Sequence, residues 1–75
     1  MSWRLEFTKT TKRMAPSELQ LALRFATPEE ADAAGRKVAA GFFWRIEHHV
    51  IESPDPPNAR YDVKNHVARR IEVIT

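Results

Sequence analysis

The sequence predicts an α+β domain of order β-β-α-β-β(-β), a two-layer sandwich in which one helix packs on an antiparallel sheet. Two segments, 3–8 and 18–26, alternate apolar and polar residues, as half-buried strands do. An alanine-rich stretch after Thr27 repeats its apolar residues at helical spacing, and β-rich segments follow it. A chain of 75 residues has room for one domain, which covers residues 1–75.

The first two strands are predicted from a period of two. Their apolar faces would be formed by Trp3, Leu5 and Phe7 in the first strand and by Leu19, Leu21, Leu23 and Phe25 in the second. In this register Leu21 belongs to the core and Gln20 faces solvent. The connection between the strands is polar and contains Pro16, and adjacent strands joined in this way most often form an antiparallel hairpin.

The helix is predicted to begin at Thr27 or Pro28. The Thr27 hydroxyl can cap the first turn, Pro28 suits the first helical position, and Glu30 stands where a capping box needs an acid. The apolar stripe of this helix consists mostly of small residues: Ala31, Ala34, Gly35, Val38 and Phe42. Such a stripe allows close packing against a sheet, and Gly41 is expected to end the helix.

Two or three strands are expected after the helix. Residues 43–52 are rich in aromatic and β-branched side chains and predict the third strand of the chain. The proline-rich segment 53–58 excludes regular structure and predicts a stiff loop. Residues 60–63 predict a short fourth strand and residues 67–74 a final one, whose two consecutive arginines suit the edge of a sheet.

Composition narrows the classes of function. The chain has no cysteine, which excludes disulfides and thiolate zinc sites and fits a reducing compartment. No stretch approaches the roughly 20 apolar residues that cross a bilayer, and the N-terminus lacks the layout of a signal peptide. We therefore expect a cytoplasmic protein that does not contact membranes.

No catalytic residue, cofactor or metal site is predicted. Nucleophilic catalysis needs a hydroxyl, a base and an orienting acid together, but Ser2, Ser17 and Ser53 stand at a terminus or in loops. Neighbouring residues of a strand point to opposite faces, so His48 and His49 cannot hold one metal ion together. We therefore expect that the protein is not an enzyme, and that one of these histidines is half-buried and the other solvated.

A basic loop is the feature that best suits nucleic acid. Lys9, Lys12 and Arg13 stand close together in the sequence without an acidic neighbour. Lysine and arginine neutralise phosphates, and the threonines between them can donate hydrogen bonds to phosphate oxygens. The competing interpretation is an ordinary solvated loop.

An aromatic run at the end of the helix is the feature that best suits a protein partner. Phe43 and Trp44 follow Phe42 directly, and one core cannot receive all three rings. Exposed aromatic and arginine side chains often dominate the energy of protein interfaces. Phe43, Trp44 and Arg45 are therefore the predicted protein-binding residues; the competing interpretation is that the rings close the end of a shallow core.

Two stretches carry a resemblance to a known group of proteins: residues 24–31 (RFATPEEA) and residues 50–61 (VIESPDPPNARY). On these stretches the chain resembles short uncharacterised proteins of bacteriophages and mobile elements of actinobacteria and related bacteria. In that group an aromatic usually stands where this chain has Ala59, and tryptophan where it has Tyr61. The resemblance covers about half of the chain. It implies the predicted fold and a phage-like origin, but no activity and no functional residues.

The leading hypothesis is a small non-catalytic accessory protein that works by protein binding, such as a phage-type modulator or inhibitor of a host protein or defence complex. Its partner would be a host or phage protein. The alternative hypothesis is a nucleic-acid-binding module that uses Lys9, Lys12 and Arg13. A homodimer is compatible with both hypotheses.

Overall fold

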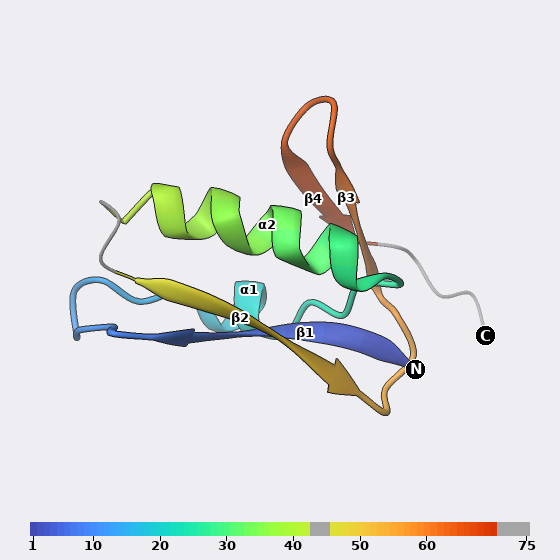
Figure 1. Cartoon of the computed structure of the whole chain (residues 1–75), viewed down its shortest axis with the longest axis horizontal. Coiled ribbons are helices and arrows are strands. Elements are labelled where there is room, and N and C mark those ends of the chain that lie inside the picture. The colour runs from blue at the N-terminus through green and yellow to red at the C-terminus, as the bar shows by residue number, and fades with distance from the viewer. Residues whose placement is uncertain (43–45, 71–75) are drawn as a thin grey trace.

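The computed structural model describes residues 1–42 and 46–70, and only the backbone of Arg70. Its elements, in chain order, are β1 (Ser2–Thr8), α1 (Glu18–Leu21), α2 (Pro28–Ala40), β2 (Glu47–Ser53), β3 (Ala59–Asp62) and β4 (Val67–Arg70). Figure 1 shows two layers, in which α2 lies along one face of the ribbon formed by β1 and β2. The predicted α+β class and the packing of a helix on a sheet are confirmed.

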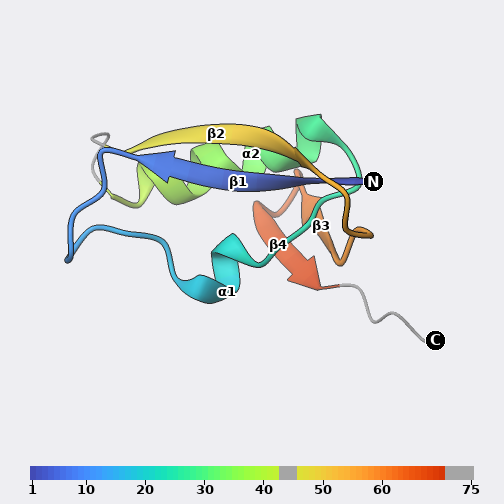
Figure 2. The same cartoon turned by 90° about the horizontal axis from the view of Figure 1, so that it is seen from below.

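The strands form two antiparallel ribbons, β1–β2 and β3–β4. Phe25 connects these ribbons through its backbone. It exchanges two hydrogen bonds of 2.8 Å with Trp3 and forms a parallel bridge with Ala59. The order across the molecule is therefore β2, β1, Phe25, β3, β4, and within the described residues β2 and β4 are the outer strands (Figure 2).

The predicted second strand, 18–26, is wrong, and so is its hairpin with the first strand. Ser17 and Gln20 instead open α1 with a complete capping box, in which each side chain accepts a hydrogen bond from the other residue's backbone amide. Leu19 and Leu21 are 69% and 38% exposed, whereas Gln20 is half-buried, so the predicted register is wrong too. Glutamate, leucine, glutamine and alanine favour helix, and the segment has no β-branched residue that would favour a strand.

The helix α2 begins where the sequence predicts. Thr27 Oγ1 accepts a hydrogen bond of 3.2 Å from the Glu30 amide, and Pro28 is the first helical residue. The cap is one-sided, because within the described ranges Glu30 Oε2 is buried and has no hydrogen-bond partner. The helix ends at Ala40, directly before Gly41, as expected.

The predicted stripe of small residues is the face that α2 turns to the sheet. Ala31, Ala34 and Gly35 are buried and Val38 is half-buried, whereas Phe42, also half-buried, lies beyond the end of the helix. A Cβ atom on Gly35 would lie only 2.5 Å from Cδ2 of His48 and 2.9 Å from Cδ2 of Leu5. Glycine is therefore what allows the helix to approach the ribbon this closely at this position.

The later strands match the predicted ones in part. β2 begins at Glu47, whereas the predicted strand began at residue 43; residues 43–45 lie outside the described part of the chain. β3 covers Ala59–Asp62, one residue earlier than predicted at each end. β4 begins at residue 67 as predicted, and the rest of that predicted strand, after Arg70, lies outside the described residues.

The core lies where both ribbons meet α2. It consists of Leu5, Phe25, Ala31, Ala34, Ala59 and Tyr61. Phe25 is 0% exposed and, among the residues that the structure describes, has the largest fully buried side chain. Its backbone also bridges the two ribbons, so this residue joins the halves of the molecule by hydrogen bonds and by packing.

Candidate functional site

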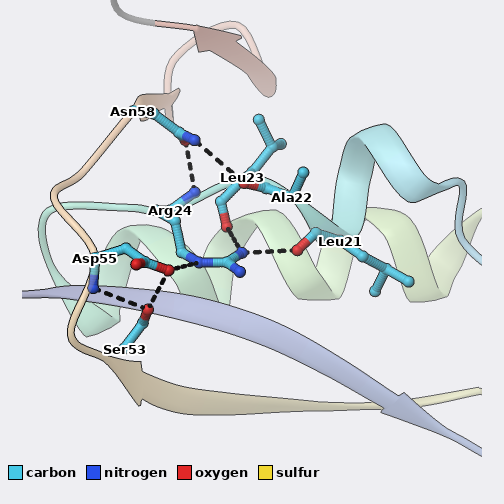
Figure 3. Close-up of polar contacts among 7 residues, drawn as sticks. All are labelled: Leu21, Ala22, Leu23, Arg24, Ser53, Asp55 and Asn58. Atoms are coloured by element: carbon cyan, nitrogen blue, oxygen red, sulfur yellow. Dashed lines mark hydrogen bonds and ion pairs between the residues drawn. The ribbon is translucent and has the colours of Figure 1, made fainter. Parts of the chain in front are cut away.

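A polar junction ties the segment after α1 to the proline-rich loop before β3 (Figure 3). We define the polar junction as Arg24, Ser53, Asp55 and Asn58. The Asn58 side chain accepts a hydrogen bond of 2.7 Å from the Arg24 amide and donates one of 3.2 Å to the Ala22 carbonyl. In return, the Arg24 carbonyl accepts hydrogen bonds from the amides of Asn58 and Ala59, at 2.8 and 3.1 Å. The two segments are therefore held together by backbone and side chain at once.

The guanidinium of Arg24 completes the polar junction. Its Nη1 donates to the carbonyls of Leu21 at 2.8 Å and Leu23 at 3.1 Å, and its Nε lies 3.4 Å from Asp55 Oδ2 (Figure 3). The same Asp55 oxygen accepts a hydrogen bond of 3.2 Å from Ser53 Oγ. Because these groups bond to one another, we assign the polar junction a structural role: it fixes the segment that leaves α1 to the loop that leads into β3.

The two stretches that carry the resemblance, 24–31 and 50–61, meet at the polar junction. Sequence reasoning predicted the helix start in the first stretch and the proline-rich loop in the second, but it missed their contact. Arg24 and Asn58 are 34 positions apart, and hydrogen bonds between two loops leave no periodic signal in a sequence. A polar residue within each irregular segment, arginine in one and asparagine in the other, is the one local sign of the contact.

An apolar groove lies between α1, α2 and the β3–β4 ribbon. Its volume is about 440 Å³. Its apolar lining comes from both helices, from β1, β3 and β4 and from the segment between the helices: Leu5, Leu19, Leu23, Phe25, Ala34, Val38, Tyr61, Val67 and Ala68. Two of these side chains are well exposed, Leu19 by 69% and Val67 by 46%. Exposed apolar residues around a hollow are typical of surfaces that bind a partner.

Polar side chains lie among the apolar ones of the groove: Gln20, Lys37 and His66. His66 has a left-handed backbone, with φ of 54°, and its Nδ1 lies 3.3 Å from the Tyr61 hydroxyl. Lys37 comes from the last turn of α2 and brings a positive charge. The apolar groove therefore suits an apolar segment that also carries a carboxylate.

The histidines of β2 point to opposite faces. His48 is half-buried and lies 2.9 Å from Asp32 of α2, whose second oxygen pairs with Arg36 at 3.1 Å. The hydrogen bond from His48 lowers the pKa of Asp32; partial desolvation opposes this shift and the charge of Arg36 supports it. His49 is exposed and lies 2.9 Å from the Thr8 hydroxyl. The part of the chain that the structure describes contains no group of three or more residues that could hold a metal ion.

The basic loop is exposed, but one of its predicted phosphate-binding residues is already paired. Lys9 has a φ of 60° and donates a hydrogen bond of 2.6 Å to Glu47 at the start of β2. That hydrogen bond lowers the pKa of Glu47, which keeps the carboxylate charged beside the lysine. Lys12 and Arg13 are exposed and are therefore the stronger candidates for a phosphate contact.

The predicted protein-binding residues Phe43, Trp44 and Arg45 lie outside the described residues. The hypothesis that they form an interface stays a prediction. Their neighbour Phe42 is half-buried and follows the C-cap of α2.

Comparison with protein-family models, with curated proteins and with solved structures finds no match to this chain. Among the described residues, no helix has the length and apolar character that crossing a membrane requires. The surfaces described above are therefore what indicates the function.

Proposed function

We propose that the protein is a non-catalytic binding module that holds an apolar segment of a partner protein in the apolar groove. The observation that supports this most directly is the exposure of Leu19 and Val67, which come from different elements and line the same hollow. Covering such side chains removes apolar surface from water, which is favourable by about 25 cal/mol for each Å². A partner that fills the groove would therefore gain binding energy at both walls.

The polar side chains of the groove define the chemistry of the partner segment. Lys37 can pair with an acidic residue, and His66 adds a polar group at the β4 side. The partner segment would thus be amphipathic, with apolar residues for the groove and at least one aspartate or glutamate for Lys37. Charge complementarity of this kind gives specificity and orientation more than affinity.

The described charged residues support a binding module better than an enzyme. Glu47 and Asp55 each pair with a cationic side chain from a distant segment, and Asp32 bonds to His48 of β2, so these carboxylates connect parts of the fold. The biological setting that we propose is the one the resemblance suggests, a phage-type modulator or inhibitor of a host protein or defence complex. Phe43, Trp44 and Arg45 remain predicted contributors to the contact.

Peptide selection tests the proposal. Random peptides are selected on the full-length protein, and the affinity of the enriched peptides is measured by titration. We expect these peptides to share apolar residues and an acidic residue. We expect Leu19→Gln and Val67→Thr to weaken binding by about tenfold each, because each removes apolar contact while preserving an exposed side chain of similar size.

The matched control is Val63→Thr. Val63 lies in the turn of the same ribbon and is 62% exposed, but it does not line the apolar groove. Equal losses in Val63→Thr and Val67→Thr, or enriched peptides without apolar residues, would place the site elsewhere.

Oligonucleotide binding that disappears when Lys12 and Arg13 are replaced by alanine would favour the alternative function, a nucleic-acid-binding module. The salt dependence of that binding in the unmodified protein should include about two phosphate contacts from Lys12 and Arg13, because Lys9 is paired.

A further inference from the structure

We propose that two copies of this chain associate through the outer edge of β2, so that the two β1–β2 ribbons form one continuous antiparallel sheet. This goes beyond the proposed function, because it concerns the edge of the sheet opposite to the apolar groove. Figure 2 shows β2 on the side of β1 that faces away from β3 and β4. Within residues 1–42 and 46–70, β2 pairs with β1 alone.

The backbone groups that face the open edge can be identified from the pairing on the other side of β1. Trp3 exchanges both of its hydrogen bonds with Phe25, so its N–H and C=O point away from β2. Residues of a strand alternate in this respect, and the β1–β2 register is continuous. The backbone N–H and C=O groups of Leu5 and Phe7 therefore also point away from β2. The backbone groups of the β2 residues opposite them point away from β1.

The residues opposite Trp3, Leu5 and Phe7 are Glu52, Val50 and His48. They form the non-hydrogen-bonded pairs of the ribbon, so their N–H and C=O groups point outward to the open edge. Unpaired backbone groups in a row are a template for another strand. Their side chains lie on the face that α2 covers, as the close approach of His48 to Gly35 requires.

The outward groups are complementary to themselves. When a second β2 pairs antiparallel about a two-fold axis at Val50, each outward N–H meets an outward carbonyl of the other copy. In this register Val50 lies opposite Val50, and His48 lies opposite Glu52 on both sides of the axis. A valine pair at the centre and an imidazole facing a carboxylate are favourable cross-strand neighbours.

Neighbouring registers fit less well. A shift toward the C-terminal end brings Pro54, which has no N–H, opposite His48. A shift toward the N-terminal end sets His49 opposite His49 and brings Glu52 opposite Ile46, which is buried and lies outside the strand. The other outer strand, β4, is a poorer edge, because its consecutive Arg69 and Arg70 discourage strand addition.

Two changes test the edge, with association measured by sedimentation from micromolar to millimolar concentration. Replacing Val50 by N-methylvaline removes an outward N–H without removing a β1–β2 hydrogen bond, so we expect a folded monomer. Glu52→Lys sets a positive charge opposite His48 and should weaken association by about tenfold or more. A strand edge buries less than the roughly 1,200 Å² of a stable interface, so the association of the unmodified chain should be weak and concentration-dependent.

The matched control is Glu18→Lys, which makes the same change of charge on the exposed surface of α1. This variant should leave association unchanged. Circular dichroism of each variant tests whether it is folded. A protein that stays monomeric at millimolar concentration overturns the proposal. So does an association that Glu52→Lys and N-methylvaline leave unaltered. Leu19→Gln should not affect the dimer, so failure of the groove and failure of the edge are separate results.

Discussion

Gly35 sets the distance between α2 and the β1–β2 ribbon. A methyl group there would overlap the His48 ring and the end of the Leu5 side chain. Neither neighbour can move easily, because His48 is bonded to Asp32 and Leu5 is buried in the core. We expect overpacking in Gly35→Ala to cost about 1–3 kcal/mol. The gain in helix propensity offsets up to about 1 kcal/mol of this cost, so the free energy of unfolding measured in urea should fall.

Gly41→Ala is the control for that substitution. Gly41 has an ordinary helical φ of −68°, and the nearest atom to an added Cβ would be the Val38 carbonyl oxygen at 3.3 Å. The exchange should therefore leave stability nearly unchanged. If Gly35→Ala proves as harmless as Gly41→Ala, the two layers do not depend on the glycine.

Among the elements, α1 is the one whose place depends most on polar contacts. It has no buried residue, so packing contributes little to holding it. The polar junction holds the segment that leaves α1, and in doing so it positions the α1 wall of the apolar groove. The binding surface thus depends on hydrogen bonds that lie outside it.

Asn58→Ala tests this dependence. The substitution leaves the partly buried Arg24 amide without its 2.7 Å acceptor, so we expect a loss of about 1–3 kcal/mol in the free energy of unfolding. Peptide binding in the groove should weaken as well. Asn65→Ala is the control, because the Asn65 side chain bonds to Asp62 at the exposed turn before β4, and the substitution should change stability little. Equal stability of the two variants would contradict a structural role for the polar junction.

The helix α2 shows what local chemistry can predict. Its cap, its first proline and its stripe of small residues are neighbours in the sequence, so its start at Pro28 and its buried face were predictable. The segment 18–26 shows the limit. Its alternating leucines satisfy a strand pattern, but they are also good helix formers, and the capping box at Ser17 decided in favour of a short helix.

At the scale of the whole molecule, Phe25 is the connection between the two ribbons. Its side chain is fully buried in the core, and its backbone bridges Trp3 and Ala59. We expect Phe25→Ala to cost about 3–5 kcal/mol. That is a large share of the roughly 5–15 kcal/mol that stabilises a domain, so thermal unfolding should show a strongly destabilised or unfolded protein.

Leu21→Ala is the comparison for Phe25→Ala. The alternation in the sequence placed both residues on one buried face, but Leu21 is exposed and should cost less than about 1 kcal/mol when truncated. A loss in Leu21→Ala as large as the loss in Phe25→Ala would restore the predicted strand and contradict the observed fold.

The sequence by itself determined the α+β class, the start and buried face of α2, most of the strands after it and the opposite orientation of His48 and His49. These features depend on the order of neighbouring residues, on caps and on side-chain periodicity. The tertiary structure alone decided that β1 pairs with β2, that Phe25 joins the ribbons, and that Arg24 meets Asn58. It also decided where the apolar groove lies and which backbone groups of β2 remain open. These contacts join residues far apart in the chain, and many pairings satisfy the same local pattern until all apolar surfaces must be buried in one core.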